Sequence, residues 1–526
     1  MCIRDSYKAS DAKLITDGLA AAKTAVAAAL ASSGVTLGST DPLTVAFAAN
    51  GSSDFDQLLG KLARGSLIGN PVQVVALEPA NFKGLLDAGS PGLTLVVGSP
   101  KCTVSVYYMR YNTVGGAGET TNASGAIMLP SGADAACSGA RPVVLYSHGT
   151  TVEKKFNMAD LNNGEAALVA ASFAAQGFIV VASNYAGYDT SALAYHPYLN
   201  AEQQAADMID ALRAARKAFT GLSASASSKL FIAGYSQGGH VAMATHRAML
   251  SSAYSAEFQP TALGGMSGPY AMALFGDTIF AGRPNAGATI FMPMVVNSWQ
   301  KSYGGLYASL SDLYESQWSS GIDKVIPGPY SFTTLVTEGK LPQLAFFASD
   351  SLPAAAAGFE VFFGSGNLVK SSFRNAYLAD AVANPCNDAN GMPVSCSPGN
   401  AFRKFAVKND LRNYVPSTPV MLCGGKEDPT VFYPVNTQTA QAYFLTKGMP
   451  AAALTVVDVD SAPSGTSDPF AAAKLGFALA KKATAASGGS TAAGQAQAVA
   501  EAYHGGLVPP FCSAVVQGYF KALAAL

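Results

Sequence analysis

The pentapeptide Gly234-Tyr235-Ser236-Gln237-Gly238 places a serine in the G-x-S-x-G pattern of nucleophilic serines. The run at 229–233 predicts a short buried strand, and the run at 239–250 predicts a helix. Glycines beside the serine permit a turn that is too tight for neighbouring Cβ atoms, so the hydroxyl projects above the strand. A chance match is the alternative in a chain with 52 glycines, but the flanking strand and helix favour a nucleophile at Ser236.

A serine nucleophile of this kind is followed along the chain by an acid and then by a histidine. The chain has five histidines, so the search for the base is short. His148 and His196 precede the serine and are out of order, while His240 and His246 fall on the helix directly after it. His504 remains, late in the chain and followed by two glycines. We predict that His504 is the general base and that it lies on a loop.

The acid of such a constellation is expected after a late strand. The apolar run at 419–423 predicts that strand, and Asp428 lies in the glycine-containing turn that follows it. An aspartate there can hold the imidazole in its working tautomer and stabilise the imidazolium. Glu427 is the nearest rival, whereas Asp458 and Asp460 end the next predicted strand. A turn aspartate can also be a simple cap, which is the alternative role for Asp428.

An acyl-transfer site also needs donors for the oxyanion. The backbone N–H of Gln237, the residue after the nucleophile, is the expected first donor. The second comes from a loop after an earlier strand, predicted here at 142–147 and followed by His148-Gly149-Thr150. We expect Thr150 or its neighbour to supply it. The side chain of His148 is better explained as a brace for that loop.

The cysteines indicate an oxidising compartment. The chain has seven, and setting aside Cys2 leaves six with informative positions. We expect three disulfides. Cys102–Cys137 would join the ends of two predicted strands, Cys386–Cys396 would close a turn-rich loop, and Cys423–Cys512 would connect the segments of the acid and the histidine. Six reduced, buried thiols are the alternative. The sequence has no C-x-x-C spacing or His/Cys cluster, so we expect no metal and no cofactor.

Predicted strands alternate with predicted helices through much of the chain, which favours an α/β protein with a mostly parallel sheet covered on both faces. The pattern changes to helices and loops rich in aromatic residues and methionine after the strand near 261–265. We therefore expect four parts. They are an N-terminal leader and accessory segment at 1–100, the first part of the core at 101–268, a helical cap at 269–415, and the second part of the core at 416–526.

The segments at 145–150, 184–188, 234–239, 424–428 and 504–505 resemble those of secreted bacterial α/β-hydrolases. They are also similar to the fungal secretory lipase family of the lipase A type, in which a helical lid is inserted before the acid-bearing strand. The resemblance implies an α/β-hydrolase fold and ester hydrolysis through an acyl-enzyme, carried by Ser236, Asp428 and His504. Some enzymes of this type attack synthetic polyesters, which adds polyesters to the substrates that the resemblance suggests.

Composition excludes several other classes. The formal net charge is −1 and only 13% of residues are charged, so the chain lacks the electrostatic footprint of a nucleic-acid-binding protein. It has no uncharged apolar run of about 18 residues, so we expect no integral membrane segment. Residues 1–6 lack an apolar core and a cleavage site. We expect that a native signal peptide is missing and that the protein is secreted or periplasmic.

The expected partner is an ester with an apolar acyl or aromatic part, including polymeric esters. A serine peptidase of the prolyl or tripeptidyl aminopeptidase type is the main alternative, because it uses the same order of catalytic residues. That activity needs an acidic or polar clamp for the peptide amine, and the predicted cap has few acidic clusters. A binding module without catalysis is a second alternative, which the presence of all three residue types in order disfavours.

Overall fold

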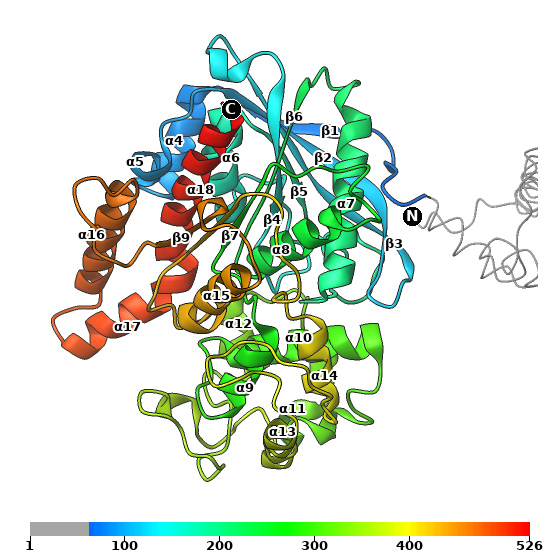
Figure 1. Ribbon diagram of the computed structural model, residues 1–526, viewed down its shortest axis with the longest axis vertical. Coiled ribbons are helices and arrows are strands. Elements are labelled where there is room, and N and C mark those ends of the chain that lie inside the picture. Colours follow the sequence, from blue (N-terminus) through cyan, green and yellow to red (C-terminus); the bar gives the residue numbers. More distant parts are fainter. Residues whose placement is uncertain (1–62, 526) are drawn as a thin grey trace, which may run out of the picture. The chain divides into compact units, whose positions relative to one another are not determined.

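The computed structural model describes residues 63–525, whose strands form a nine-stranded mixed sheet with helices on both faces (Figure 1). The strand order is β1-β2-β3-β5-β4-β6-β7-β8-β9. Pairing is antiparallel from β1 to β5 and parallel from β5 to β9. The strands are β1 (Val72–Leu77), β2 (Thr103–Val114), β3 (Thr120–Ser131), β4 (Arg141–Ser147), β5 (Ile179–Ser183), β6 (Ala226–Tyr235), β7 (Ala262–Met266), β8 (Val420–Gly424) and β9 (Leu454–Asp458).

The parallel strands are short and apolar because helices cover them on both sides. Every residue of β5, β7 and β8 is buried, which is typical of the interior strands of a doubly covered sheet. In β2, by contrast, buried and partly exposed positions largely alternate, as expected for a strand with one face toward the core. Two of the catalytic candidates, Ser236 and Asp428, follow the strands β6 and β8, so rigid elements position them.

Two apolar cores separate the sheet from its helices. One core packs against α6 (Gly164–Ser172) and α18 (Val508–Ala524), and the other against α7 (Ala201–Phe219), α8 (Gln237–Leu250) and α15 (Thr439–Thr446). The first core also includes α4 (Pro79–Gly89) and α5 (Leu93–Val97). Figure 1 shows that α18, near the C-terminus, lies beside α4 and α5 from the opposite end of the described chain.

A helical cap with its own apolar core is inserted between β7 and β8 (lower part of Figure 1). It covers the region that the sequence assigns to a cap. Trp299 and Tyr377 are fully buried at its centre, and Phe280 stacks on the ring of Tyr377. The cap helices are α9 (Met272–Phe280), α10 (Ala288–Tyr303), α11 (Ser316–Ser319), α12 (Phe332–Thr337), α13 (Ser371–Ala383) and α14 (Ala401–Lys408).

Residues 63–100, which the sequence groups with the N-terminal segment, are continuous with the core. The strand β1 pairs with β2 as an edge of the sheet, and Phe82 and Leu86 of α4 are buried in the core. Residues 1–62 of that segment lie outside the described residues. At the other end, α16 (Ala471–Ser487) and α17 (Ala492–Ala502) form a helical hairpin before the segment that carries His504.

Within residues 63–525 three disulfides form, with the same pairings that the sequence suggests: Cys102–Cys137, Cys386–Cys396 and Cys423–Cys512. The last joins the end of β8 to α18 across 89 residues of sequence. In the chain-entropy model, a disulfide closing a loop of that length stabilises a fold by about 4.6 kcal/mol. The bond therefore ties together the two segments that carry Asp428 and His504.

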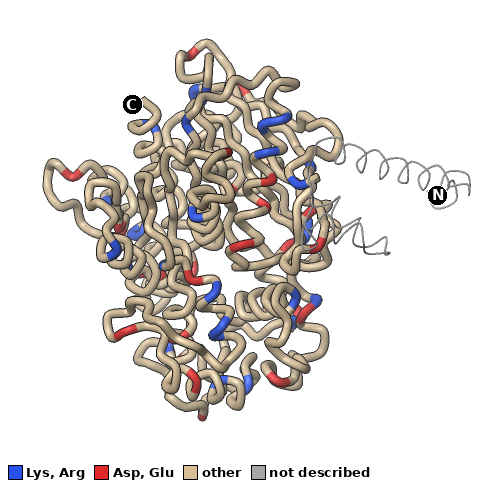
Figure 2. The backbone as a smooth tube through the Cα atoms, turned by 45° about the vertical axis from the view of Figure 1, so that its right-hand side comes forward, with Lys and Arg blue, Asp and Glu red and all other residues tan. Residues whose placement is uncertain are grey.

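Acidic and basic residues are interspersed along the described chain, and Figure 2 shows both signs on the core and on the cap. A mixture of this kind gives no single-sign field for attracting a polyanion. Within residues 63–525 no helix combines the length and the apolar character that crossing a bilayer requires.

Candidate active site

Ser236 lies at a sharp turn between β6 and α8, with backbone angles of φ 58° and ψ −122°. A Cβ atom on Gly234 would stand 2.1 Å from the carbonyl oxygen of Gly238. A Cβ atom on Gly238 would stand 1.9 Å from the carbonyl oxygen of Ser147. Both distances are far below van der Waals contact, so only glycine fits at either position. The geometry of the turn thus explains the G-x-S-x-G pattern.

The structure brings Ser236, His504 and Asp428 into one hydrogen-bonded chain. The Nε2 atom of His504 is 2.7 Å from the Oγ atom of Ser236, and its Nδ1 atom is 2.7 Å from Oδ2 of Asp428. The Oδ1 atom of Asp428 accepts hydrogen bonds from the backbone N–H groups of Thr430 and Val431 at 2.9 and 3.0 Å. This carboxylate is therefore fixed on one side by the backbone and directs its other oxygen at the imidazole.

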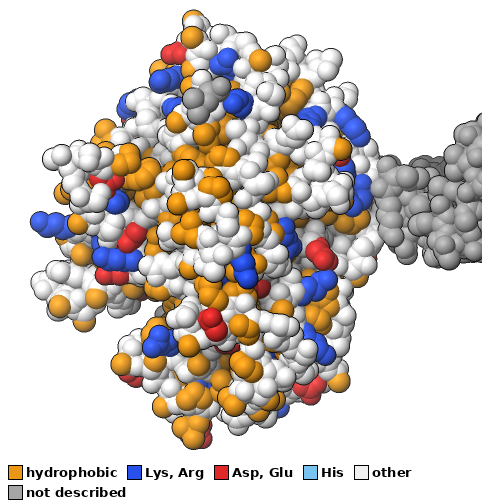
Figure 3. Space-filling view, in the orientation of Figure 1, with side chains coloured by type: hydrophobic (Ala, Val, Ile, Leu, Met, Phe, Trp, Pro, Cys, Tyr) orange, Lys and Arg blue, Asp and Glu red, His pale blue; other side chains and the backbone are white. Residues whose placement is uncertain are grey.

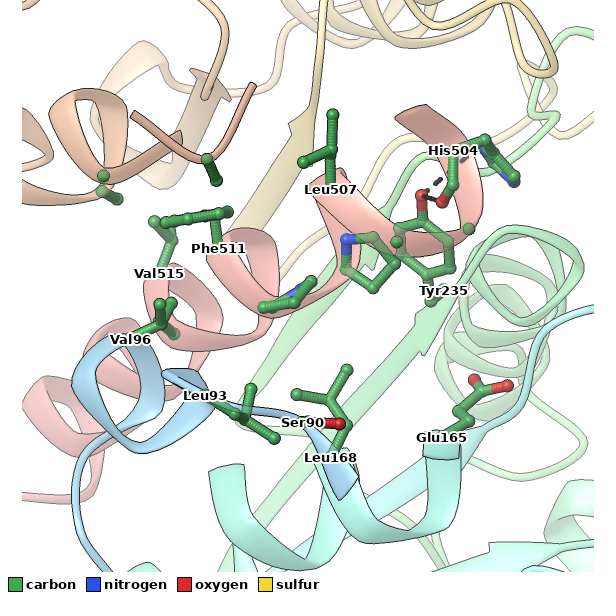
Figure 4. A pocket seen from close by; sticks show the side chains of 18 of the residues that line it. Ser90, Leu93, Val96, Glu165, Leu168, Tyr235, His504, Leu507, Phe511 and Val515 are labelled. Atoms are coloured by element: carbon green, nitrogen blue, oxygen red, sulfur yellow. Dashed lines mark hydrogen bonds between the residues drawn. The ribbon is translucent and has the colours of Figure 1, made fainter. Parts of the chain in front are cut away.

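His504 lies in a π-helical turn, η8 (Tyr503–Leu507), between α17 and α18, rather than on the loop that the sequence predicts. Irregular helical turns of this type are frequent at functional sites. The hydroxyl of Tyr235 donates to the backbone carbonyl of His504, as the dashed line in Figure 4 indicates. The residue before the nucleophile thus fixes the backbone of the histidine.

The rival acids engage other partners. Glu427 forms an ion pair with Lys481, and its side chain is 58% exposed. Asp458 accepts the backbone N–H groups of Lys426 and Asp460. Asp460 in turn pairs with Lys481. Among these four acids, Asp428 is therefore the one that contacts the imidazole of His504.

The other four histidines are buried, and burial lowers the pKa of each imidazole. The pKa falls to about 4 for His148 and His240 and to about 3 for His196 and His246. They are therefore neutral near pH 7. Across residues 63–525, no three His, Cys, Asp or Glu side chains gather as a candidate metal site.

His196 has a contact that sequence analysis missed, because its position before the serine removed it from consideration. The Nε2 atom of His196 is 2.7 Å from Nε2 of the Gln237 side chain, and its Nδ1 atom is 2.9 Å from the carbonyl oxygen of Ala186. A neutral imidazole can donate to the carbonyl through Nδ1 and accept the amide N–H at Nε2. This contact fixes the side chain of the residue directly after the nucleophile.

Gln237 and Thr150 are the residues that the sequence predicts as donors to an oxyanion. Gln237 is the first residue of α8, where the backbone N–H has no intrahelical partner and the helix dipole favours negative charge. Thr150 follows β4, lines a cavity together with Ser236, and its Oγ1 atom is 2.9 Å from the hydroxyl of Tyr198. Within the described residues, neither backbone N–H donates to a protein acceptor. Both are therefore available to a ligand.

Glu165 is a buried acid that contacts Gly149 in the loop after β4. Its Oε1 atom accepts hydrogen bonds from the backbone N–H of Gly149 and from the hydroxyl of Tyr146, each at 2.9 Å. Burial raises the pKa of this carboxyl to about 7. The sequence gives no signal for the contact, since a glutamate in the first turn of a helix is ordinary. Glu165 thus holds the residue before Thr150 in place.

Glu165→Gln is expected to flatten the pH dependence of stability. The carboxyl titrates near 4.5 without burial and about 7 in the folded chain, so the folded state binds the proton more tightly. The free energy of unfolding therefore falls as the pH rises from about 4.5 to about 7, by on the order of 3 kcal/mol. Glutamine keeps an Oε1 acceptor for Gly149 and removes this titration. Urea unfolding at pH 5 and pH 8 measures the difference.

Glu202→Gln is the matched control, because Glu202 also lies in the first turn of a helix but its side chain is 69% exposed. Burial also raises the pKa of Asp207 to about 7. Because both variants keep Asp207, its contribution to the pH dependence of stability is the same in each. If the free energy of unfolding depended on pH equally in the wild-type protein and in Glu165→Gln, burial would not raise the pKa of Glu165 as inferred.

Two cavities meet at Ser236. One has a volume of about 90 Å³ and extends under the cap, between the side chains of Phe275, Phe280 and Met292. The other has a volume of about 1370 Å³ and includes His504 and Glu165 in its lining. Ser236 therefore lines two mainly apolar spaces.

The sheet order, the turn at Ser236 and the inserted cap define an α/β-hydrolase. A model of the family described as "Secretory lipase" matches residues 155–324. A ligand-bound structure of the rice cell wall degrading esterase LipA from Xanthomonas oryzae is 26% identical with a TM-score of 0.66, covering 87% of this chain and 98% of that one. A putative hydrolase from Legionella pneumophila, 18% identical with a TM-score of 0.61, covers 87% of this chain and 98% of its own and shares the fold.

No curated protein sequence matches the chain significantly. The family model and the esterase structures nevertheless agree on the class of enzyme. The chain is a carboxylic ester hydrolase similar to the secretory lipases. The resemblance stated from the sequence and the fold class predicted there are both confirmed.

Proposed function

We propose that the protein is a secreted serine esterase that cleaves carboxylic esters through an acyl-enzyme formed on Ser236. The observation that carries the proposal is the unbroken chain of hydrogen bonds from Asp428 through His504 to the serine hydroxyl. Because Nδ1 of the imidazole donates to the carboxylate, Nε2 presents its lone pair to the serine proton. That is the protonation state a general base needs.

The proposed reaction has two steps. The Oγ atom of Ser236 attacks the ester carbonyl while Nε2 of His504 takes the proton, and the imidazolium then protonates the leaving alcohol. Water, deprotonated by the same imidazole, hydrolyses the acyl-enzyme and releases the acid. The backbone N–H groups of Gln237 and Thr150 would bind the oxyanion of each tetrahedral intermediate. Each such donor lowers the barrier by on the order of 3 kcal/mol.

Secretion is supported by the three disulfides within residues 63–525, since such bonds persist in oxidising compartments. The match to a family described as secretory supports the same location. The disulfide that joins β8 to α18 would also keep the acid and base segments in register outside the cell.

The lining of both cavities favours esters over peptides. Among the described lining residues the acidic side chain is Glu165, which already accepts hydrogen bonds from Gly149 and Tyr146. A peptidase that binds a free amine needs a carboxylate available to that amine. We extend the proposal to polyesters, because the larger cavity reaches the surface at the exposed side chains of Leu95 and Leu479.

Parallel rate measurements test the proposal. We expect kcat/KM for p-nitrophenyl esters to exceed that for aminoacyl-p-nitroanilides by at least about 100-fold, and soluble acids to be released from a polyester film. A fluorophosphonate probe is expected to add its mass to the peptide that contains Ser236. Faster turnover of the anilides, or labelling of another serine, would contradict the proposal.

A further inference from the structure

The two cavities at Ser236 differ in which catalytic groups they contain. The smaller one is lined by Gln237 and by cap side chains such as Phe275 and Phe402, and His504 is absent from its described lining. The larger one is lined by Thr150 and by His504. Only the larger cavity therefore includes the imidazole that must protonate the leaving group.

Helices on both sides of the larger cavity give it apolar walls. Figure 4 shows Leu93 and Val96 of α5 and Leu168 of α6 on one side, with Phe511 and Val515 of α18 on the other. The lining continues along α16 to Leu479, whose side chain is 70% exposed, and Leu95 at the rim is 89% exposed. Figure 3 shows apolar side chains gathered over α5 and α18 on this face. Large exposed apolar side chains at the mouth of a cavity are typical of a binding surface.

The chemistry of acyl transfer assigns one half of the substrate to each space. When the tetrahedral intermediate collapses, the bond from the carbonyl carbon to the alcohol oxygen breaks, and that oxygen takes the proton from Nε2 of His504. The alcohol must therefore lie on the side of His504, in the larger cavity. The acyl group remains on Ser236 and points away from the imidazole, toward the space under the cap.

The volumes then decide the sizes of the two halves. An apolar protein cavity of about 150 Å³ binds benzene. The space under the cap, at about 90 Å³, is smaller and accepts only a short acyl group. The larger cavity, at about 1370 Å³, accommodates a long or bulky apolar alcohol.

We propose that the cavity between α5, α6, α16 and α18 is the binding site for the alcohol part of the substrate. The preferred substrates are accordingly esters of short carboxylic acids with large apolar alcohols. This assignment rests on the proposed esterase function and deepens it. In an enzyme selective for long fatty acyl chains, the larger apolar cavity would instead have to hold the acyl group.

Two isomeric esters separate the orientations. Decyl acetate and ethyl decanoate have the same formula and nearly the same hydrophobicity, but their long chains lie on opposite sides of the ester bond. We expect the wild-type protein to hydrolyse decyl acetate with a kcat/KM at least tenfold higher, measured by pH-stat titration of the released acid. Equal rates, or faster hydrolysis of ethyl decanoate, would overturn the assignment while leaving the esterase function intact.

Filling the cavity tests its location. Ala514 on α18 and Ala480 on α16 are partly buried and line it from different helices. Ala514→Trp and Ala480→Trp are each expected to lower the ratio of kcat/KM for decyl acetate to that for ethyl acetate at least tenfold, because only the long alcohol reaches these positions. Ala522→Trp, at an exposed site of α18 outside the lining, is the matched control.

The outcomes distinguish the two proposals. Unchanged turnover of decyl acetate in both filled variants would show that the alcohol binds elsewhere, and the assignment would fall. Failure of the wild-type protein to hydrolyse ethyl acetate, decyl acetate and ethyl decanoate would instead contradict the proposed function itself. Two filling positions on separate helices keep the test valid if one variant does not fold.

Discussion

Ser236→Ala is expected to lower kcat for ester hydrolysis by about 10⁶-fold, because removing the nucleophile of such a triad leaves only binding and oxyanion stabilisation. The Oγ atom 2.7 Å from Nε2 of His504 is the group that would attack the carbonyl. Alanine keeps the Cβ atom at the turn, so the backbone is expected to persist. Burst and steady-state kinetics with p-nitrophenyl acetate measure the loss.

The matched control is Ser251→Ala, at the exposed far end of the same helix. It is expected to retain wild-type kcat. The double variant Ser236→Ala/His504→Ala should lose no more than the first variant alone, because residues that act as one unit are not additive. Retention of more than about one per cent of kcat in Ser236→Ala would contradict the assigned role, since triad losses are far larger. Thermal unfolding of each variant checks that the fold is kept.

The parts of the structure that sequence patterns predicted are those in which local sequence determines geometry. The two glycines around Ser236 are required by steric contacts of their own turn, so the pattern carries the geometry with it. Buried parallel strands are recognisable as short apolar runs, which led to the fold class. The order of serine, acid and histidine then selected Asp428 and His504 from few candidates.

The parts that sequence patterns missed depend on contacts between distant segments. Glu165 contacts Gly149 only because its helix and β4 share one apolar core, and nothing within its helix indicates this. His196 contacts Gln237 across 41 residues of sequence. Residues 63–100 belong to the core because β1 pairs with β2, a partner that a short apolar run does not identify. The sequence predicts a loop at His504, yet packing of Tyr503 and Leu507 makes this segment helical.

Asp428→Asn is expected to lower kcat by about 10⁴-fold while leaving KM and the fold nearly unchanged, as an imidazole in the wrong tautomer does in other triads. The backbone N–H groups of Thr430 and Val431 require an acceptor at Oδ1, so the new amide must direct its NH₂ group at Nδ1 of His504. The imidazole can then carry its proton only on Nε2, where it cannot accept the proton of Ser236.

Glu427→Gln tests whether the loss is specific to the carboxylate that contacts the imidazole. The two acids are adjacent in sequence, but Glu427 pairs with Lys481 and is largely exposed, so its variant is expected to keep wild-type kcat. Surface ion pairs of this kind contribute little, about 1 kcal/mol or less, to stability. A large loss in Glu427→Gln together with a small one in Asp428→Asn would assign the acid to the other carboxylate. A large loss only in Asp428→Asn would show that kcat depends on the tautomer of His504. The loss of one negative charge near the loop could not explain that result, because both variants lose one.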